Sequence, residues 1–346
     1  MKKLYTLSFI LLASLSFGQT LLYEDFNYTV GGNVGGNLAT TSDATGSNNW
    51  ATHSNTITTG TGTIDIQSGS LTYTGLAAST GNKILFPGNN TTTPRDINRP
   101  ITATASKIAY YSALVNVTDN TQLSATAAYF MGLGATAGAS VTSLGGRLGI
   151  ASSNTGFRLS IQNTSTGTPT FTEVPLDLTF GTTYFVVVKY DITTAGASVA
   201  TLWVNPTSFG GAEPVGGVSN SSGTGSFTTF ASVFLRNSSG SPKAGIDEIR
   251  VGVTWADVTP AAPLKVSQNT IAGLNMYPNP VTNGNLYITS NNSQAKSVAI
   301  YDVLGKQVVN TKTTNNAVSV ANLKRGVYIV KVTEDEKTAT RKLIIE

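Results

Sequence analysis

Tyr184-Phe185-Val186-Val187-Val188 is an almost unbroken apolar run inside the segment from Thr183 to Asp191. A strand that is covered on both faces has this composition, whereas a half-exposed strand alternates apolar and polar residues. Shorter runs of the same kind recur between Gly, Asn and Ser turns, and none has apolar residues at helical spacing. The other strands predicted before residue 258 are Thr63–Gln67, Lys107–Val117, Ala127–Leu133, Arg147–Ile150, Phe157–Gln162, Ala200–Val204, Ser232–Arg236 and Ile246–Val253. The sequence therefore predicts an all-β chain whose larger domain is a β-sandwich or jelly roll.

Composition agrees with this fold class. The chain has 346 residues, room for about two domains of 100 to 200 residues each. It has 35 glycines and only 12% charged residues, which suits short strands joined by turns, and its 40% hydrophobic content is enough for a packed core. The absence of cysteine excludes disulfides, thiolate metal sites and a cysteine nucleophile.

A second, smaller β-domain is predicted at the C-terminus. The segment Val258-Thr259-Pro260-Ala261-Ala262-Pro263 contains two prolines and suits an extended linker. We therefore expect a large domain over residues 19–258, a linker over 259–273 and a small antiparallel β-sandwich over 274–346. Its predicted strands are Leu286–Thr289, Ser297–Tyr301, Gln307–Val309, Ala317–Val320, Val327–Val332 and Arg341–Ile345.

Ordered blocks of sequence fill this C-terminal segment. They are Leu274-Asn275-Met276-Tyr277-Pro278-Asn279-Pro280, Val298-Ala299-Ile300-Tyr301-Asp302-Val303-Leu304-Gly305-Lys306, Gly326-Val327-Tyr328-Ile329-Val330-Lys331-Val332 and Thr340-Arg341-Lys342-Leu343-Ile344-Ile345. In this order they resemble the C-terminal (type A) sorting domain of cargo of the type IX secretion system of Bacteroidetes. The resemblance implies the secretion machinery as a partner, export across the outer membrane, and removal of the domain with release or attachment to surface lipopolysaccharide. The alternative is an ordinary small β-domain that ends the chain.

The N-terminus is typical of a secretory signal peptide. Lys2 and Lys3 precede an apolar run from Leu4 to Leu15, and cleavage is predicted between Gly18 and Gln19. A membrane anchor is the weaker alternative, because the run is shorter than the roughly 20 residues that span a bilayer. We expect no membrane span in the mature chain, and a secreted or cell-surface location reached through the periplasm.

The positive net charge belongs to the two ends of the chain. From Leu264 onward there are 10 basic and 5 acidic residues, whereas the stretch between the signal and that point has 10 basic and 13 acidic residues. Nucleic-acid binding requires a basic face, so we exclude it for the large domain.

A further resemblance involves the two ends of the large domain. The stretches Leu21-Leu22-Tyr23-Glu24-Asp25-Phe26-Asn27 and Gly245-Ile246-Asp247-Glu248-Ile249-Arg250-Val251 resemble the first and last strands of concanavalin A-like and laminin G-like jelly rolls. In those folds the terminal strands lie side by side, which would bring Glu24, Asp25 and Asp247 together. Because calcium prefers carboxylate and carbonyl oxygens, these three residues are candidates for a structural calcium site. The alternative is that Glu24, Asp25, Asp247 and Glu248 are solvated ends of edge strands, with Arg250 as a nearby partner.

No catalytic residue is assigned from the sequence. Glycoside hydrolysis needs two carboxylates roughly 5 to 10 Å apart, and the Glu-x-Asp-x-x-Glu spacing of laminarinase-type jelly rolls does not occur here. The remaining acidic residues of the domain are isolated in the sequence, and they are Asp43, Asp65, Asp96, Asp119, Glu173, Asp177, Asp191, Glu213 and Asp257. The single histidine, His53, lies in a polar stretch, and we predict that it is a surface loop residue.

The remaining candidates for a binding site are aromatic residues. Flat rings suit the apolar faces of sugars, so these residues could line a glycan-binding surface, although core packing is the stronger reading; they are Trp50, Tyr110, Tyr111, Tyr129 and Trp203. The sequence thus predicts a non-catalytic exported module that binds a polysaccharide or cell-surface glycan, or mediates adhesion. The alternatives are a polysaccharide-degrading hydrolase with an unrecognised carboxylate pair and a structural surface protein.

Overall fold

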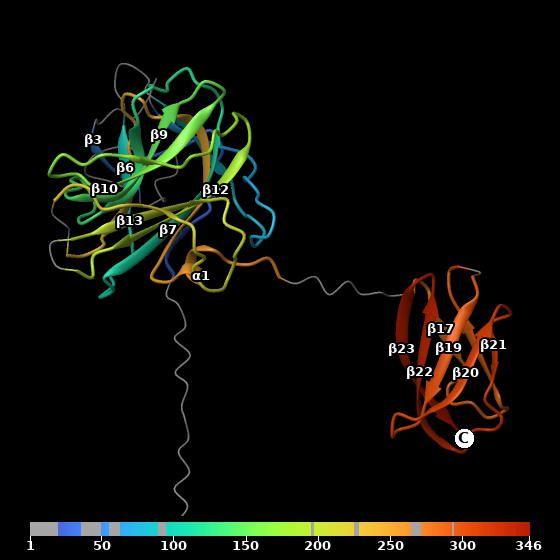
Figure 1. Ribbon diagram of the computed structural model, residues 1–346. Coiled ribbons are helices and arrows are strands. Elements are labelled where there is room, and N and C mark those ends of the chain that lie inside the picture. The colour runs from blue at the N-terminus through green and yellow to red at the C-terminus, as the bar shows by residue number, and fades with distance from the viewer. Residues whose placement is uncertain are drawn as a thin grey trace, which may run out of the picture. The chain divides into compact units, whose positions relative to one another are not determined.

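The computed structural model describes residues 20–35, 50–54, 63–88, 95–194, 197–224, 228–263, 271–292 and 294–346. The predicted signal peptide and its cleavage site at Gly18 and Gln19 lie outside these residues. The chain divides into two compact units, residues 1–263 and 264–346. Each unit is built from antiparallel sheets, so the predicted all-β class is confirmed (Figure 1).

Two sheets face each other in the large unit. The first, called the β7 sheet, has the order β14-β13-β12-β7-β16-β5-β4-β2, with β1 paired to β16. Its strands are β1 (Thr20–Glu24), β2 (Asn33–Val34), β4 (Ile64–Gln67), β5 (Lys83–Pro87), β7 (Ile108–Val117), β12 (Thr183–Asp191), β13 (Val199–Val204), β14 (Val218–Asn220) and β16 (Lys243–Gly252).

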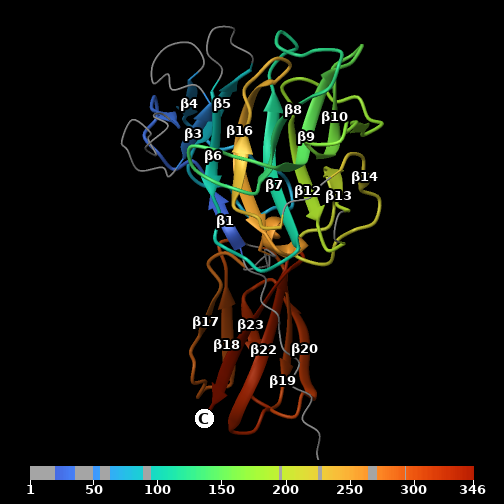
Figure 2. The same cartoon turned by 90° about the vertical axis from the view of Figure 1, so that its left-hand side faces the viewer.

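The second, called the β9 sheet, has the order β11-β10-β9-β8-β15-β6-β3. Its strands are β3 (Ala51–Ser54), β6 (Asp96–Pro100), β8 (Ala128–Gly134), β9 (Leu144–Ser152), β10 (Phe157–Thr164), β11 (Thr172–Glu173) and β15 (Ser232–Leu235). Figure 2 shows β8, β9 and β10 as neighbours in this sheet. The predicted jelly-roll sandwich is confirmed.

The central strand β12 shows why the sequence run around Val186 is almost wholly apolar. Val186 and Val188 point into the main core between the sheets. Phe185 and Val187 point to the other face of the β7 sheet, where they join a second apolar cluster. Both faces of the strand are therefore buried, as predicted.

The second cluster is covered by a single turn of helix, α1 (Trp255–Val258), which the sequence analysis did not predict. A capping box holds this turn, because the Thr254 side chain accepts from the backbone N–H of Asp257 and the Asp257 carboxylate accepts from that of Thr254. Trp255 is 3% exposed and stands edge-on to Trp203 at 5.1 Å between ring centroids. The helix thus packs on the outer face of the β7 sheet beside β16 and β7, and its Trp255 ring reaches Trp203 of β13.

The first and last strands of the large unit pair as expected. Strand β1 runs antiparallel to β16, with Tyr23 opposite Arg250 and Glu24 opposite Ile249. The register between β16 and β7 shifts between Asp247 and Arg250, and Glu248 adopts a φ of +54° there. This bulge buries the two consecutive carboxylates Asp247 and Glu248, which are 0% and 2% exposed.

The small unit is also a sandwich of two antiparallel sheets. The β18 sheet has the order β17-β18-β21, and the β22 sheet has the order β20-β19-β22-β23. The strands are β17 (Asn275–Tyr277), β18 (Asn285–Thr289), β19 (Lys296–Tyr301), β20 (Gln307–Thr313), β21 (Ala317–Ser319), β22 (Gly326–Glu334) and β23 (Lys337–Ile345). Alternate residues such as Val298, Ile300, Val330 and Val332 fill its core.

The linker is shorter than the predicted span of 259–273. At its start, the Pro260 carbonyl accepts from Ala77 N–H, and Ala262 N–H donates to Gly75, so these residues belong to the large unit. At its end, Ile271 is buried in the core of the small unit. Pro260 and Pro263 do not form a separate linker, because the backbone beside them makes hydrogen bonds to the loop after β4. Within the described residues, no helix is long and apolar enough to cross a membrane.

Candidate functional site

The outer face of the β9 sheet carries a cluster of charged and aromatic side chains. Strand alternation directs Leu148 and Phe130 into the core, so their neighbours Arg147 and Tyr129 lie on the opposite, outer face. Phe234 of β15 lies on the same face, directly over Gly132, where an added Cβ would approach its ring to 2.9 Å. The glycine therefore lets an aromatic ring lie flat on this part of the sheet.

Tyr129 stands between two arginines. The guanidinium carbons of Arg147 and Arg236 each lie 4.4 Å from the centre of its ring. Such contacts contribute about 0.5 to 2 kcal/mol each, depending on how fully the cation is desolvated. Two positive charges held beside one ring favour an anionic ligand at this place, and we call Tyr129, Arg147 and Arg236 the arginine–tyrosine site.

Both arginines are fixed by the backbone around them. Arg236 donates to the Tyr129 carbonyl at 3.3 Å and to Ser238 Oγ at 2.9 Å. Arg147 donates to the Thr164 carbonyl and is only 5% exposed. Burial, together with the nearby Arg236 charge, lowers the pKa of Arg147. Among the described residues, neither arginine forms an ion pair with a carboxylate.

His53 lies on this face and not in a loop. It belongs to β3, where its ring is edge-on to Phe234 at 6.5 Å, and Tyr129 is edge-on to the same ring at 6.2 Å. Burial lowers the pKa of His53 to about 4, so the imidazole is neutral at physiological pH. The prediction of a surface loop residue is therefore wrong, because the polar neighbours that suggested a loop form the edge strand of the sheet.

Asn98 sets the orientation of His53. The Asn98 side chain accepts from the backbone N–H of Gly138 at 2.9 Å and donates to the Gly138 carbonyl at 2.8 Å, which fixes its amide. Its Nδ2 then lies 3.1 Å from Nδ1 of His53. Because Nδ2 can only donate, Nδ1 accepts, and the proton of the neutral ring resides on Nε2.

A single carboxylate, Asp96, borders this face. It accepts from the backbone N–H of Asn237 at 2.9 Å, and burial raises its pKa against the opposing effects of Ser54, Asn237 and the Arg236 charge. A hydrolase would need a second carboxylate on the same face. The described strands of the β9 sheet place none beside Asp96, and the other acidic side chain in them, Glu173, pairs with Arg158.

The first predicted calcium ligand is occupied by protein donors. Glu24 is 2% exposed and accepts from Phe26 N–H at 2.8 Å, Tyr28 Oη at 2.7 Å and Trp50 Nε1 at 2.8 Å. It also pairs with Arg99. Its carboxylate thus holds the first strand to the core.

The other two predicted ligands lie at the β16 bulge. Asp25 accepts from Thr80 Oγ1 at 2.9 Å. Asp247 accepts from Leu71 N–H at 2.8 Å and Glu248 N–H at 2.7 Å, and burial, with smaller effects of Glu248 and Asp25, raises its pKa to about 8. Among the residues that the structure describes, no group of three or more acidic or histidine side chains could hold a metal ion. The calcium site stays a prediction.

Most of the aromatic candidates are structural. Trp50 and Tyr111 are fully buried in the main core, and Tyr110 and Trp203 belong to the second cluster. Tyr129 is the exception, because it is partly exposed between its arginines. Alternation about Leu148 could have placed Arg147 outward from the sequence, but only the pairing of β8 with β9 and β15 brings it to Tyr129 and Arg236.

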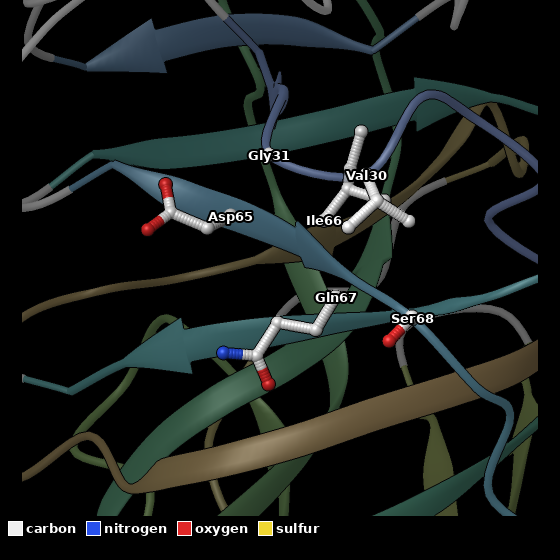
Figure 3. A pocket seen from close by; sticks show the side chains of 6 residues that line it. All are labelled: Val30, Gly31, Asp65, Ile66, Gln67 and Ser68. Carbon is white, nitrogen blue, oxygen red and sulfur yellow. The ribbon is translucent and has the colours of Figure 1, made fainter.

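A separate hollow lies at the end of the β7 sheet. It has a volume of about 490 Å³ and is lined by Val30, Gly31, Asp65, Ile66, Gln67 and Ser68. Figure 3 shows one carboxylate and one amide among these side chains. The described lining contains no cation and no aromatic ring, so it offers less for an anionic ligand than the arginine–tyrosine site.

Comparison with protein families identifies the C-terminal unit. Residues 275–346 match the secretion system C-terminal sorting domain. The small unit therefore belongs to this family, the predicted sorting domain is confirmed, and the chain is exported to the cell surface or the medium.

The individual proteins to which this chain is similar include several lyases. An ulvan lyase of Nonlabens ulvanivorans is 35% identical over 86 residues, which cover 24% of this chain and 16% of that lyase. Among solved structures, an alginate lyase bound to an alginate tetrasaccharide has 13% identity and a TM-score of 0.41, covering 66% of this chain and 95% of that one. An endo-β-1,4-glucuronan lyase from Trichoderma reesei has 12% identity and the same TM-score, with 71% and 100% covered. Likeness at this level does not transfer an activity.

The predicted main function is corrected by these comparisons. The sequence analysis favoured a non-catalytic glycan-binding or adhesion module, whereas the curated relative is a polysaccharide lyase. The alternative of a polysaccharide-degrading enzyme agrees better with this finding. The earlier prediction depended on the missing acidic motif, and a lyase does not need the carboxylate pair on which that motif is based.

Proposed function

We propose that this chain, which ends in a secretion sorting domain, is an exported lyase for polysaccharides that contain uronic acids. The observation that carries the proposal is the placement of Tyr129 between Arg147 and Arg236 on the open face of the β9 sheet. The curated match to an ulvan lyase supports it, although that match spans 16% of the lyase. We also propose that the large unit is a jelly roll of the concanavalin A-like type.

The two arginines suit the carboxylate of a uronate residue. Removing a proton from the carbon next to a carboxylate places negative charge on the carboxylate oxygens in the transition state. Fixed cations in a partly desolvated site stabilise that charge, an effect worth about 3 kcal/mol for one well-placed donor. Arg147, buried and held by Thr164, is preorganised for this role.

Tyr129 and His53 complete the proposed chemistry. The Tyr129 hydroxyl would transfer the proton between the sugar carbon and the departing glycosidic oxygen, so that a carbon–carbon double bond forms as the carbon–oxygen bond breaks. His53 is neutral and carries its proton on Nε2, so it can donate a hydrogen bond to the uronate without adding charge. This division uses neither a metal nor a second carboxylate.

The decisive test is the product formed from a panel of polysaccharides. The purified chain is incubated with uronate polymers and with neutral polymers of similar length. We expect new ultraviolet absorbance from unsaturated sugar ends with the uronate polymers alone. Saturated reducing ends would identify a hydrolase instead, and the absence of any product would refute an enzymatic role on these substrates.

A further inference from the structure

The small unit presents two outer faces of different character. On the β18 sheet, the exposed rings of Tyr277 and Tyr287 stack at 5.7 Å, and the neighbouring strand residues are uncharged. The β22 sheet is different, because its outer face has an apolar centre surrounded by lysines. Among the strand residues of this unit, charge is therefore confined to the β22 sheet.

Strand register defines the second face. Val330 and Val332 point into the core, so Val327, Ile329 and Lys331 of β22 point outward. Lys342 of β23 lies opposite Ile329, and Lys312 of β20 lies opposite Ser297 on the outer side of β19. We call Val327, Ile329, Lys312, Lys331 and Lys342 the lysine face.

The apolar centre of this face is open to solvent. Val327 and Ile329 are each 40% exposed although they are β-branched residues of β22, an interior strand of its sheet. Their cross-strand neighbours Ile344 and Tyr301 extend the apolar stripe on both sides. A contiguous apolar patch with a charged rim has the anatomy of a protein interface.

No acidic side chain of the four strands lies beside the three lysines. The four strands of the β22 sheet, all within the described residues, contain one acidic residue, Glu334. It is 3% exposed and pairs with the buried Lys296 at 3.1 Å, on the core side. Self-association through this face would bring like charges together, which disfavours a second copy as the occupant.

We propose that the lysine face is the surface by which the sorting domain docks onto an acidic protein component of the export machinery. The partner would present carboxylates around an apolar centre that covers Val327 and Ile329. The face lies wholly within the unit that matches the sorting family, so it is independent of the activity of the large unit. Long-range attraction of the lysines would speed the encounter, and the apolar centre would lengthen the life of the complex.

A charge reversal with a matched control tests this proposal in the full chain. Lys331→Glu with Lys342→Glu reverses two charges on the face. Lys306→Glu with Lys324→Glu makes the same change in net charge at exposed residues outside it. We expect the first variant to accumulate in the periplasm, with at least a tenfold loss of exported protein, and the control to be exported normally. Equal export of the two variants, or equal retention of both, would overturn the proposal.

Two further measurements keep the outcome interpretable. Thermal melting of both purified variants should give midpoints close to that of the unaltered chain. If Lys331→Glu with Lys342→Glu unfolds, Lys331→Gln with Lys342→Gln serves instead. This variant removes the two positive charges without adding negative ones, and it should still reduce export. Binding of the unaltered chain to lipopolysaccharide vesicles that is lost in the face variant, with export intact, would assign the face to the membrane surface and refute a protein partner.

Discussion

At the level of single residues, the proposed activity depends on where three side chains meet. Tyr129 lies on β8, Arg147 lies on β9 and Arg236 directly follows β15, and each has an ordinary role when considered alone. The alternation of apolar and polar residues indicates which face of its strand a side chain occupies. It does not show that the three side chains cluster, because that requires knowing that β8 lies between β9 and β15. Strand order is set by the packing of the whole sheet, so the site could not be derived from local sequence.

Arg236→Ala should reduce kcat/KM on a uronate polymer by about a hundredfold or more, as removal of one fixed transition-state donor commonly does. Arg236 is partly exposed, so we expect a small change in melting temperature. Lys243→Ala, which removes a cation of the β7 sheet paired with Asp119, serves as the control and should retain activity. A variant at Arg236 with normal turnover would contradict the role of the arginine pair.

His53 should make stability depend on pH. Its pKa is about 4 in the folded chain and about 6.5 when unfolded, so the unfolded state alone takes up a proton between these values. The free energy of unfolding should fall by roughly 3 kcal/mol as the pH drops through this window. Denaturant unfolding of His53→Gln should show a much weaker fall, and an unchanged pH profile would show that the ring is not buried in its neutral form.

At the scale of elements, the sequence was informative about long strands and poor on short ones. Strand β12 was predicted at its observed bounds, because nine residues buried on both sides leave a strong apolar signal. The two-residue strand β2 and the polar edge strand β3 carry no such signal. Helix α1 was missed because one turn is too short for helical periodicity.

The bulge in β16 should give a pH dependence of opposite sign. Asp247 has a pKa of about 8 when folded and about 3.9 when unfolded, so the folded chain holds an extra proton between these values. Stability should therefore decline as the pH rises from about 4 to 8. Asp247→Asn should abolish this decline in urea unfolding, and a variant that retains it would place its origin elsewhere.

The calcium prediction is tested at the same place. An ion bound by Glu24, Asp25 and Asp247 would raise the melting midpoint in calcium relative to a chelator, because it binds only the folded chain. Many of the relevant oxygens already accept protein hydrogen bonds. Identical midpoints in the two conditions would eliminate the site.

At the level of the whole molecule, the two units differ in net charge, and the sorting signal belongs to the small unit. The sorting unit contains 10 basic and 5 acidic residues, and the stretch between the signal and Leu264 contains 10 and 13. An acidic large unit does not attract a polyanion over a distance. Recognition of a uronate polymer must therefore come from the local arginine–tyrosine site, and it should weaken as salt concentration rises.

The ordered motifs identified the small unit from the sequence, whereas the function of the large unit was predicted incorrectly. The identification of the small unit depends on short blocks of consecutive residues, which can be read without knowing how the strands pair. The proposed function of the large unit depends on a face assembled from β3, β8, β9 and β15, whose partners are more than one hundred residues apart in places, such as Tyr129 and Arg236. Sequence reasoning searched for a carboxylate pair and overlooked the arginines.

The most direct measurement is the turnover of a uronate polymer by Tyr129→Phe, compared with Tyr73→Phe, whose ring packs on Phe185 at the other sheet. Both changes remove one hydroxyl. We expect unsaturated product from the unaltered chain and from Tyr73→Phe, and a loss of at least a hundredfold in Tyr129→Phe. Full activity of Tyr129→Phe would contradict the assignment of the active site to the open face of the β9 sheet.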